Sequence, residues 1–181
     1  MRKILVIVGS GIKNGNTDKL ADAYIKGAEA AGHEITKVFL GDKEIAGCRG
    51  CGACQNGKHI CAIDDVMQEI YPLLEKCDTV VLASPLYFWS ISARTKAFID
   101  RLYAISTDDK YPHKNSVLLM TAGDDQFWTF EQPASYYRFV TKAIGWTDIG
   151  MYFAGGCNGE AGKRHIDEKH LEGAYLLGST M

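Results

Sequence analysis

Short apolar runs alternate with amphipathic helical patterns along almost the whole chain, and this alternation restricts the fold more than any other feature. Near-continuous apolar strands are typical of a parallel sheet that is covered on both faces. Five strands with helical crossovers predict an α/β fold, a doubly wound five-stranded parallel sheet with helices on both faces. The expected strands are Lys3–Val8, Glu34–Leu40, Thr79–Ser84, Ser116–Thr121 and Asp148–Ala154. The expected helices are Thr17–Ala31, Val66–Lys76, Ala93–Tyr103 and Ala134–Ile144, with one more between Gly162 and Met181.

The expected helix Val66–Lys76 carries two local signals. Asp64 or Asp65 is expected to cap its start, with Gln68 reaching back as in a capping box. Pro72 falls inside the pattern and is expected to kink or split the helix.

Length and charge limit the organisation of the chain and its partners. With 181 residues, 46% of them apolar, the chain can bury one substantial core, so residues 1–181 are expected to form a single domain. The 20 basic and 22 acidic residues give a formal net charge of -2, and no run of like charge is long enough to indicate a nucleic-acid-binding face. Small molecules are therefore the expected partners.

The apolar stretches are too short for either a membrane span or a secretory signal. The five apolar residues after Met1-Arg2-Lys3 run directly into a glycine-rich loop, unlike a signal peptide. We therefore expect a cytoplasmic protein without a membrane partner, whose six cysteines are reduced thiols or metal ligands and not a disulfide framework.

The segment Gly9–Thr17 joins the first expected strand to the first expected helix and reads Gly-Ser-Gly-Ile-Lys-Asn-Gly-Asn-Thr. Its glycines let backbone amides turn inwards, Ser10 and Thr17 add hydroxyl donors, and the positive end of the helix points to the same place. The segment has neither the glycine spacing of a dinucleotide-binding loop nor the Gly-Lys-Ser/Thr of a nucleoside-triphosphate loop. It indicates a monophosphate site. The alternative is an ordinary turn in which Asn16 or Thr17 caps the helix.

A second distinctive segment, Ser84–Ser92, follows the third expected strand. It holds three consecutive aromatic residues, Tyr87, Phe88 and Trp89, at the carboxyl end of a strand, where a turn faces the ligand-binding crevice of such a sheet. Pro85 stiffens the backbone, so that this segment can lie along a planar heterocycle. A dimer contact is the alternative, and the two interpretations can coexist.

Together with Lys96–Arg101, these two segments resemble the flavodoxin-like NAD(P)H-dependent FMN reductase family, and the resemblance covers nearly the whole chain in element order. It implies a flavodoxin-like FMN-binding domain in which the first loop holds the phosphate and the second passes along the isoalloxazine ring. Many members carry an arginine in the phosphate loop, where this chain offers Lys13. The implied FMN-binding residues are Ser10, Lys13, Asn14, Asn16, Thr17, Pro85, Leu86, Tyr87, Phe88, Trp89, Ala122 and Gly123.

The same resemblance implies a function. The chain would be an FMN-dependent oxidoreductase, a homodimer or higher homo-oligomer, that passes electrons from NAD(P)H to a quinone, a flavin, or an azo or nitro compound. The flavin performs the hydride chemistry, so no catalytic side chain is expected. The alternative is a flavodoxin-type electron carrier acting between protein partners, but such carriers usually surround their flavin with acidic residues, and this chain is near neutral.

Four cysteines lie in one glycine-rich segment: Cys48, Cys51 and Cys54 are each separated by two residues, and Cys61 follows after six more. Thiolates at this spacing can converge on one inorganic core, and four is the number that a 4Fe–4S cluster takes. The pattern resembles the cysteine motif of iron-sulfur flavoproteins, which would make the chain an electron carrier with both centres. A zinc site, a redox-active dithiol and a cysteine-rich loop without a cluster remain alternatives.

Overall fold

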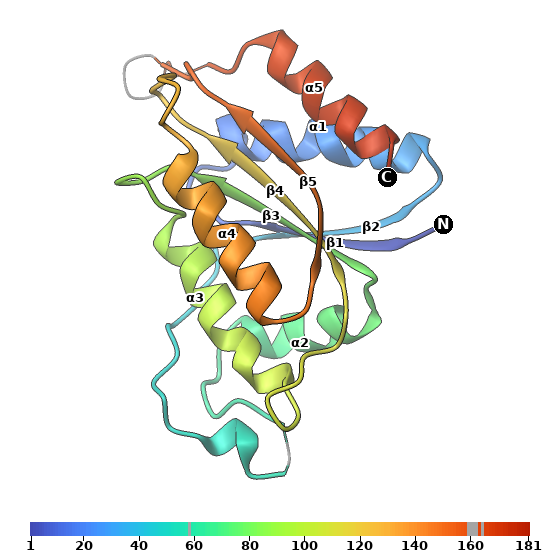
Figure 1. Cartoon of the computed structure of the whole chain (residues 1–181), viewed down its shortest axis with the longest axis vertical. Coiled ribbons are helices and arrows are strands. Elements are labelled where there is room, and N and C mark those ends of the chain that lie inside the picture. Colours follow the sequence, from blue (N-terminus) through green and yellow to red (C-terminus); the bar gives the residue numbers. More distant parts are fainter. Residues whose placement is uncertain (58, 159–162, 164) are drawn as a thin grey trace.

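Five parallel strands form one sheet in the order β2-β1-β3-β4-β5 (Figure 1). This is the strand order of flavodoxin-like sheets, with a topological switch point between β1 and β3, and the predicted fold class is confirmed. The computed structural model describes residues 1–57, 59–158, 163 and 165–181. The strands are β1 (Lys3–Val8), β2 (Glu34–Phe39), β3 (Thr79–Pro85), β4 (Asn115–Thr121) and β5 (Thr147–Ala154).

The helices cover both faces of the sheet (Figure 1). On one face lie α1 (Asn16–Ala30) and α5 (Glu168–Ser179), and on the other lie α2 (Met67–Lys76), α3 (Ala93–Arg101) and α4 (Glu131–Ala143). Two short 3-10 helices, Ala53–Gln55 and Leu102–Ile105, complete the described elements. None of the helices in the described part of the chain has the length and apolar character that a membrane span requires.

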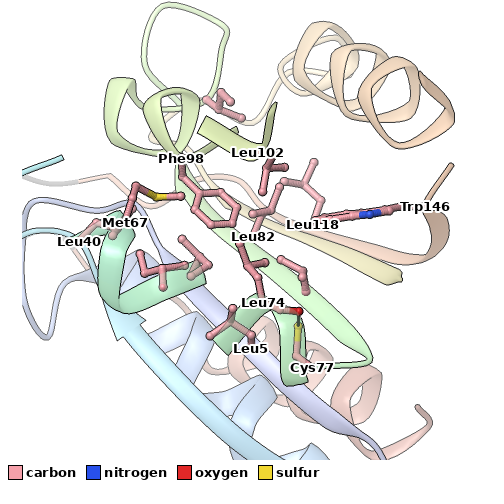
Figure 2. Close-up of a cluster of buried hydrophobic side chains, with 14 of the residues drawn as sticks. Leu5, Leu40, Met67, Leu74, Cys77, Leu82, Phe98, Leu102, Leu118 and Trp146 are labelled. Atoms are coloured by element: carbon pink, nitrogen blue, oxygen red, sulfur yellow. Dashed lines mark hydrogen bonds between the residues drawn. The ribbon is translucent and has the colours of Figure 1, made fainter. Parts of the chain in front are cut away.

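Two hydrophobic cores follow from the alternation of side chains along the strands. In β1, Leu5 and Ile7 point towards α2 and α3, whereas Val6 and Val8 point towards α1 and α5. Figure 2 shows the first core, in which Met67 and Leu74 of α2 and Phe98 of α3 pack over the strands. Because β1, β3 and β4 are buried on both faces, their sequences are almost continuously apolar.

The predicted element boundaries mostly agree with the structure to within two residues. Two helices differ more clearly. Helix α4 begins at Glu131 and not at Ala134, and α5 begins only at Glu168, so that residues 165–167 of the expected terminal helix are not helical. Part of the expected terminal helix falls on residues 162 and 164, outside the described residues. Pro72 lies inside α2 without splitting it. The buried face of α2, formed by Met67, Ile70 and Leu74, holds the helix together across the missing backbone donor.

Helices α1 and α5 approach each other at two glycines. A Cβ atom added at Gly27 would lie 2.0 Å from the carbonyl oxygen of Tyr175, and one added at Gly178 would lie 2.2 Å from that of Tyr24. Both obstacles are backbone atoms, which rotation of a side chain cannot remove. The two helices can therefore pack this closely only with glycine at these positions.

Replacing Gly27 by alanine is expected to lower the free energy of unfolding by about 1–2 kcal/mol, because forced separation of α1 and α5 outweighs the better helix propensity of alanine. Urea denaturation measures the change. A stabilised Gly27→Ala variant would contradict the close approach of the two helices.

Candidate functional site

The loops that follow β1, β3 and β4 meet at the carboxyl edge of the sheet and enclose a cleft of about 360 Å³. In sheets of this topology, ligands bind at this edge, beside the switch point. The residues that line the cleft are Ser10, Ile12, Asn14, Gly15, Asn16, Thr17, Lys19, Pro85, Leu86, Tyr87, Thr121, Ala122, Gly123 and Cys157. All the FMN-binding residues predicted above are among them except Lys13, Phe88 and Trp89.

The start of α1 opens into this cleft. Gly15 occupies the N-cap position, and within the described residues no side chain caps this end. The alternative interpretation, in which Asn16 or Thr17 caps the helix, is therefore wrong. The first amides of a helix have no intrahelical acceptor and carry the positive end of its dipole. An uncapped helix start that faces a cleft can bind an anion such as a phosphate monoester.

The loop before α1 is held by one buried carboxylate. Asn14 has a left-handed backbone with φ of 57°, and its amide donates to Asp18 Oδ2 at 2.7 Å. Lys37 Nζ lies 2.6 Å from Asp18 Oδ1 and 2.6 Å from Asp22 Oδ1. Burial opposes the charge of Lys37, but its hydrogen bonds to Asp18 and Asp22 prevail and raise its pKa. The negative charge of Asp18 is thus paired on the side away from the loop.

A pair of buried hydroxyls connects the first loop to the third. Thr17 Oγ1, in the first turn of α1, lies 2.7 Å from Thr121 Oγ1, at the end of β4. The second loop joins them, since the amide of Leu86 donates to the carbonyl oxygen of Thr121 at 2.8 Å. The three loops therefore form one hydrogen-bonded wall of the cleft.

The second loop separates the three aromatic residues that the sequence places side by side. Tyr87 and Ser90 exchange backbone hydrogen bonds of 2.9 and 3.1 Å around a two-residue turn. In this turn Phe88 and Trp89 both have positive φ values, 47° and 55°. Tyr87 lines the cleft, whereas Phe88 and Trp89 line an adjoining hollow of about 440 Å³.

The lysine that lines the cleft is not the one that the sequence predicted. Lys13 is exposed and lies outside the lining of the cleft, so its predicted contact with the phosphate stays a prediction. Lys19, one turn into α1, lines the cleft instead, although nothing in the loop pattern distinguishes it. Cys157 also lines the cleft, and burial raises the pKa of its thiol to about 11, which keeps it protonated at neutral pH.

The four cysteines of the proposed cluster motif lie on the loop between β2 and α2. Cys48 and Cys51 are exposed, and Cys54 and Cys61 are half-buried. They fit an iron-sulfur cluster in kind and number. Among the residues that the structure describes, however, no three Cys, His, Asp or Glu side chains are gathered closely enough to hold a metal ion. The described residues of this loop therefore do not form a preassembled metal site.

The ends of this cysteine loop are held together by Arg101, which is 1% exposed. Its guanidinium donates to Asp65 at 2.8 and 3.2 Å, to the carbonyl oxygen of Ala46 at 3.0 Å, and to that of Ile63 at 3.3 Å. Ala46 precedes the first cysteine of the loop and Ile63 follows the last. Arg101 and Asp65 thus close the neck of the cysteine loop.

Comparison with known proteins shows the family of the chain. A family model described as NADPH-dependent FMN reductase matches residues 2–129. An iron-sulfur flavoprotein of Archaeoglobus fulgidus is 35% identical over 182 residues, covering 99% of this chain and 78% of that protein. One of Methanosarcina thermophila is 38% identical over 99 residues, covering 55% of this chain and 51% of that protein.

Solved structures share the fold. An NAD(P)H:quinone oxidoreductase from Methanothermobacter marburgensis superposes with a TM-score of 0.77 at 17% identity, covering 99% of this chain and 96% of that one. At this level of identity the similarity establishes the architecture alone.

Proposed function

The chain belongs to the NADPH-dependent FMN reductase family, a family of oxidoreductases, and on this premise we propose that it passes electrons from NAD(P)H through FMN to a small acceptor. The acceptor would be a quinone, a flavin, or an azo or nitro compound. The single observation that carries the proposal is the uncapped start of α1, which opens into a cleft bounded by the loops after β3 and β4.

The size and the chemistry of the cleft support the proposal. Its volume of about 360 Å³ lies within the range of ligand pockets. The phosphate would bind at the start of α1, beside Asn16 and Thr17, and the ring would lie along Pro85, Leu86 and Tyr87. FMN, when bound, supplies the hydride and electron chemistry. The residues of the chain bind it, orient it and limit the access of water.

Reduction of the bound flavin under anaerobic conditions tests this function. We expect NADH or NADPH to bleach the flavin absorbance of the FMN-loaded protein within seconds. A flavin that only a partner protein can reduce would favour the electron-carrier alternative.

Replacing Thr17 by alanine is expected to weaken FMN binding by about 1–2 kcal/mol, because it removes a hydroxyl beside the phosphate and the hydrogen bond to Thr121. Flavin fluorescence measures the dissociation constant. Thr17→Ser keeps the hydroxyl and serves as the control. An unchanged dissociation constant in Thr17→Ala would remove Thr17 from the phosphate site.

An iron-sulfur flavoprotein is the second candidate. It is favoured by Cys48, Cys51, Cys54 and Cys61 together with a relative of that name aligned along 99% of the chain. In this form the protein would carry electrons between protein partners. Anaerobic purification followed by iron and sulfide analysis tests it. About four of each per chain would support a cluster, and iron near zero in fresh protein would reject it.

Assembly and location stay predictions. The family resemblance implies a homodimer or higher homo-oligomer, which sedimentation would detect, and the composition led us to expect a cytoplasmic protein.

A further inference from the structure

The backbone conformation of the turn at Phe88 and Trp89 is energetically unfavourable for bulky aromatic residues. Both residues are left-handed, a conformation that Asn and Gly adopt readily in such two-residue turns and bulky side chains rarely adopt. Phe88 is 95% exposed, so burial of its ring does not compensate for the backbone conformation. Strained residues of this kind cluster where ligands bind. The aromatic side chains of this turn therefore point to a role other than folding.

The turn forms one wall of the hollow beside the FMN cleft. The rings of Trp89 and Trp128 stack with centroids 5.9 Å apart and planes at 28°. The hollow shares Leu86, Ala122 and Gly123 with the cleft, so that a molecule in it would adjoin bound FMN. Its volume of about 440 Å³ lies within the range of small-molecule sites. Flat aromatic walls of this kind favour flat aromatic ligands.

Asp124 is the one charged residue among the described residues that line this hollow. Asp124 lines it, with its carboxylate accepting a hydrogen bond from Thr129 Oγ1 at 2.6 Å. Glu131 lines a further hollow, which shares Trp89 and Trp128 with this one. Among the described residues, neither lining contains a lysine or an arginine. An anionic ligand would meet uncompensated negative charge here, which costs binding energy.

We propose that the hollow between Trp89, Trp128 and Asp124 is the acceptor site, and that it selects flat aromatic molecules that are neutral or cationic over anionic ones. The inference rests on the proposed function, because an acceptor has to lie beside the FMN. Exposed Phe88 and Phe127 would also suit a contact with a second copy of the chain, but the carboxylate and the shared wall with the cleft favour a small ligand.

Calorimetric titration of the oxidised, FMN-loaded protein with 2-naphthamide and 2-naphthoate tests the proposal. These probes share two fused rings and differ in charge. We expect 2-naphthamide to bind more tightly than 2-naphthoate. Asp124→Asn should reduce the difference in affinity between the two probes, because it removes the negative charge. The asparagine amide oxygen still accepts the hydrogen bond from Thr129 Oγ1. Equal affinities of the wild-type protein for the two probes, or no binding of either, would overturn the proposal.

Variants of the aromatic wall complete the test. Trp128→Ala is expected to weaken 2-naphthamide binding by roughly 3- to 10-fold, whereas Trp128→Phe retains most of the affinity. Phe88→Asn is expected to raise the melting temperature, because it relieves the turn, and to weaken 2-naphthamide binding. A lower melting temperature for Phe88→Asn would show that Phe88 serves the fold and would count against the proposal.

Two outcomes separate this proposal from neighbouring ones. If Trp128→Ala converts a dimer into a monomer in sedimentation without changing the affinity for 2-naphthamide, the aromatic surface is a subunit interface and the acceptor site is rejected. Binding of 2-naphthamide needs no turnover, so it is independent of flavin reduction. Failure of NAD(P)H to reduce the flavin would therefore refute the proposed function, whereas failure of 2-naphthamide to bind would refute only the site.

Discussion

Asp65→Asn is expected to lower the free energy of unfolding by roughly 3–5 kcal/mol, because it leaves a buried guanidinium without its counter-charge. Arg101 is 1% exposed, and its guanidinium donates to both carboxylate oxygens of Asp65. Its Nε atom has no hydrogen-bond partner among the described residues. No acceptor at Nε therefore compensates for the lost carboxylate of Asp65. Arg101 also donates to the carbonyl oxygens of Ala46 and Ile63 at the two ends of the cysteine loop. If Arg101 moves once the ion pair is lost, these two contacts are lost as well and the ends of the loop separate.

Urea denaturation at neutral pH measures this effect. Asp64→Asn is the matched control, because Asp64 is the exposed neighbour and its loss should change stability little. A loss below about 1 kcal/mol for Asp65→Asn would mean that the ion pair does not hold the loop.

The same pair predicts how stability changes in acid. Burial alone would raise the pKa of Asp65, but hydrogen bonds from Arg101 and from the amides of Ala46 and Met67 prevail and lower it. Because the folded pKa is lowered, its contribution is complete above the ordinary pKa of about 4 and is lost as the pH falls through the lowered value. Below a pH of about 4, the free energy of unfolding of Asp65→Asn should therefore fall less steeply than that of the natural chain.

Gly9→Val is expected to weaken FMN binding by roughly 10- to 100-fold. A Cβ atom at Gly9 would lie 1.9 Å from Thr95 Oγ1 and 2.9 Å from Ser92 Oγ, at the buried start of α3. Ser92 Oγ also donates to the carbonyl oxygen of Gly9 at 2.7 Å. A larger side chain would displace the first loop from α3 and, with it, the donors that face the cleft.

Equilibrium titration with FMN measures the loss, and circular dichroism checks that the variant remains folded. Gly47→Val is the control, since an added Cβ there meets no described atom within 4 Å. A folded Gly9→Val variant with the FMN affinity of the natural chain would show that the loop does not depend on this contact.

The sheet was predictable because its signals are local. Buried parallel strands such as Thr79–Pro85 are continuous apolar runs, and the glycine-rich segment after Val8 marks where the first strand ends. The topology then brings the loops after β1, β3 and β4 to one edge. For this reason most of the residues that the sequence predicts to bind FMN lie around one cleft, while their contact with FMN stays a prediction.

Long-range pairs could not be predicted in the same way. Asp64 or Asp65 was expected to cap α2, but Val66 occupies the N-cap position. Asp65 nevertheless accepts the amide of Met67 at 3.0 Å. Its partner Arg101, however, lies 36 residues away, a contact that no local pattern encodes. Gln68 was expected to reach back to the cap, but it donates to the carbonyl groups of Cys61 and Ile63.

The separation of the aromatic residues could not be predicted either. Three consecutive aromatic residues indicate one flat surface. A two-residue turn with positive φ at both positions usually contains Asn-Gly, so the sequence Phe-Trp does not indicate such a turn. With Phe88 and Trp89 at positive φ, the turn carries them out of the cleft that Tyr87 lines. Trp128 joins them from a different loop, which only the tertiary structure reveals.

Binding of FMN and riboflavin to the flavin-free protein tests the central claim, that the start of α1 holds the phosphate of FMN. The two ligands differ only in this phosphate. We expect one FMN per chain and an affinity at least about 100-fold higher than that for riboflavin, since several charge-assisted hydrogen bonds depend on the phosphate. Equal affinities, or no binding of FMN, would contradict the assignment.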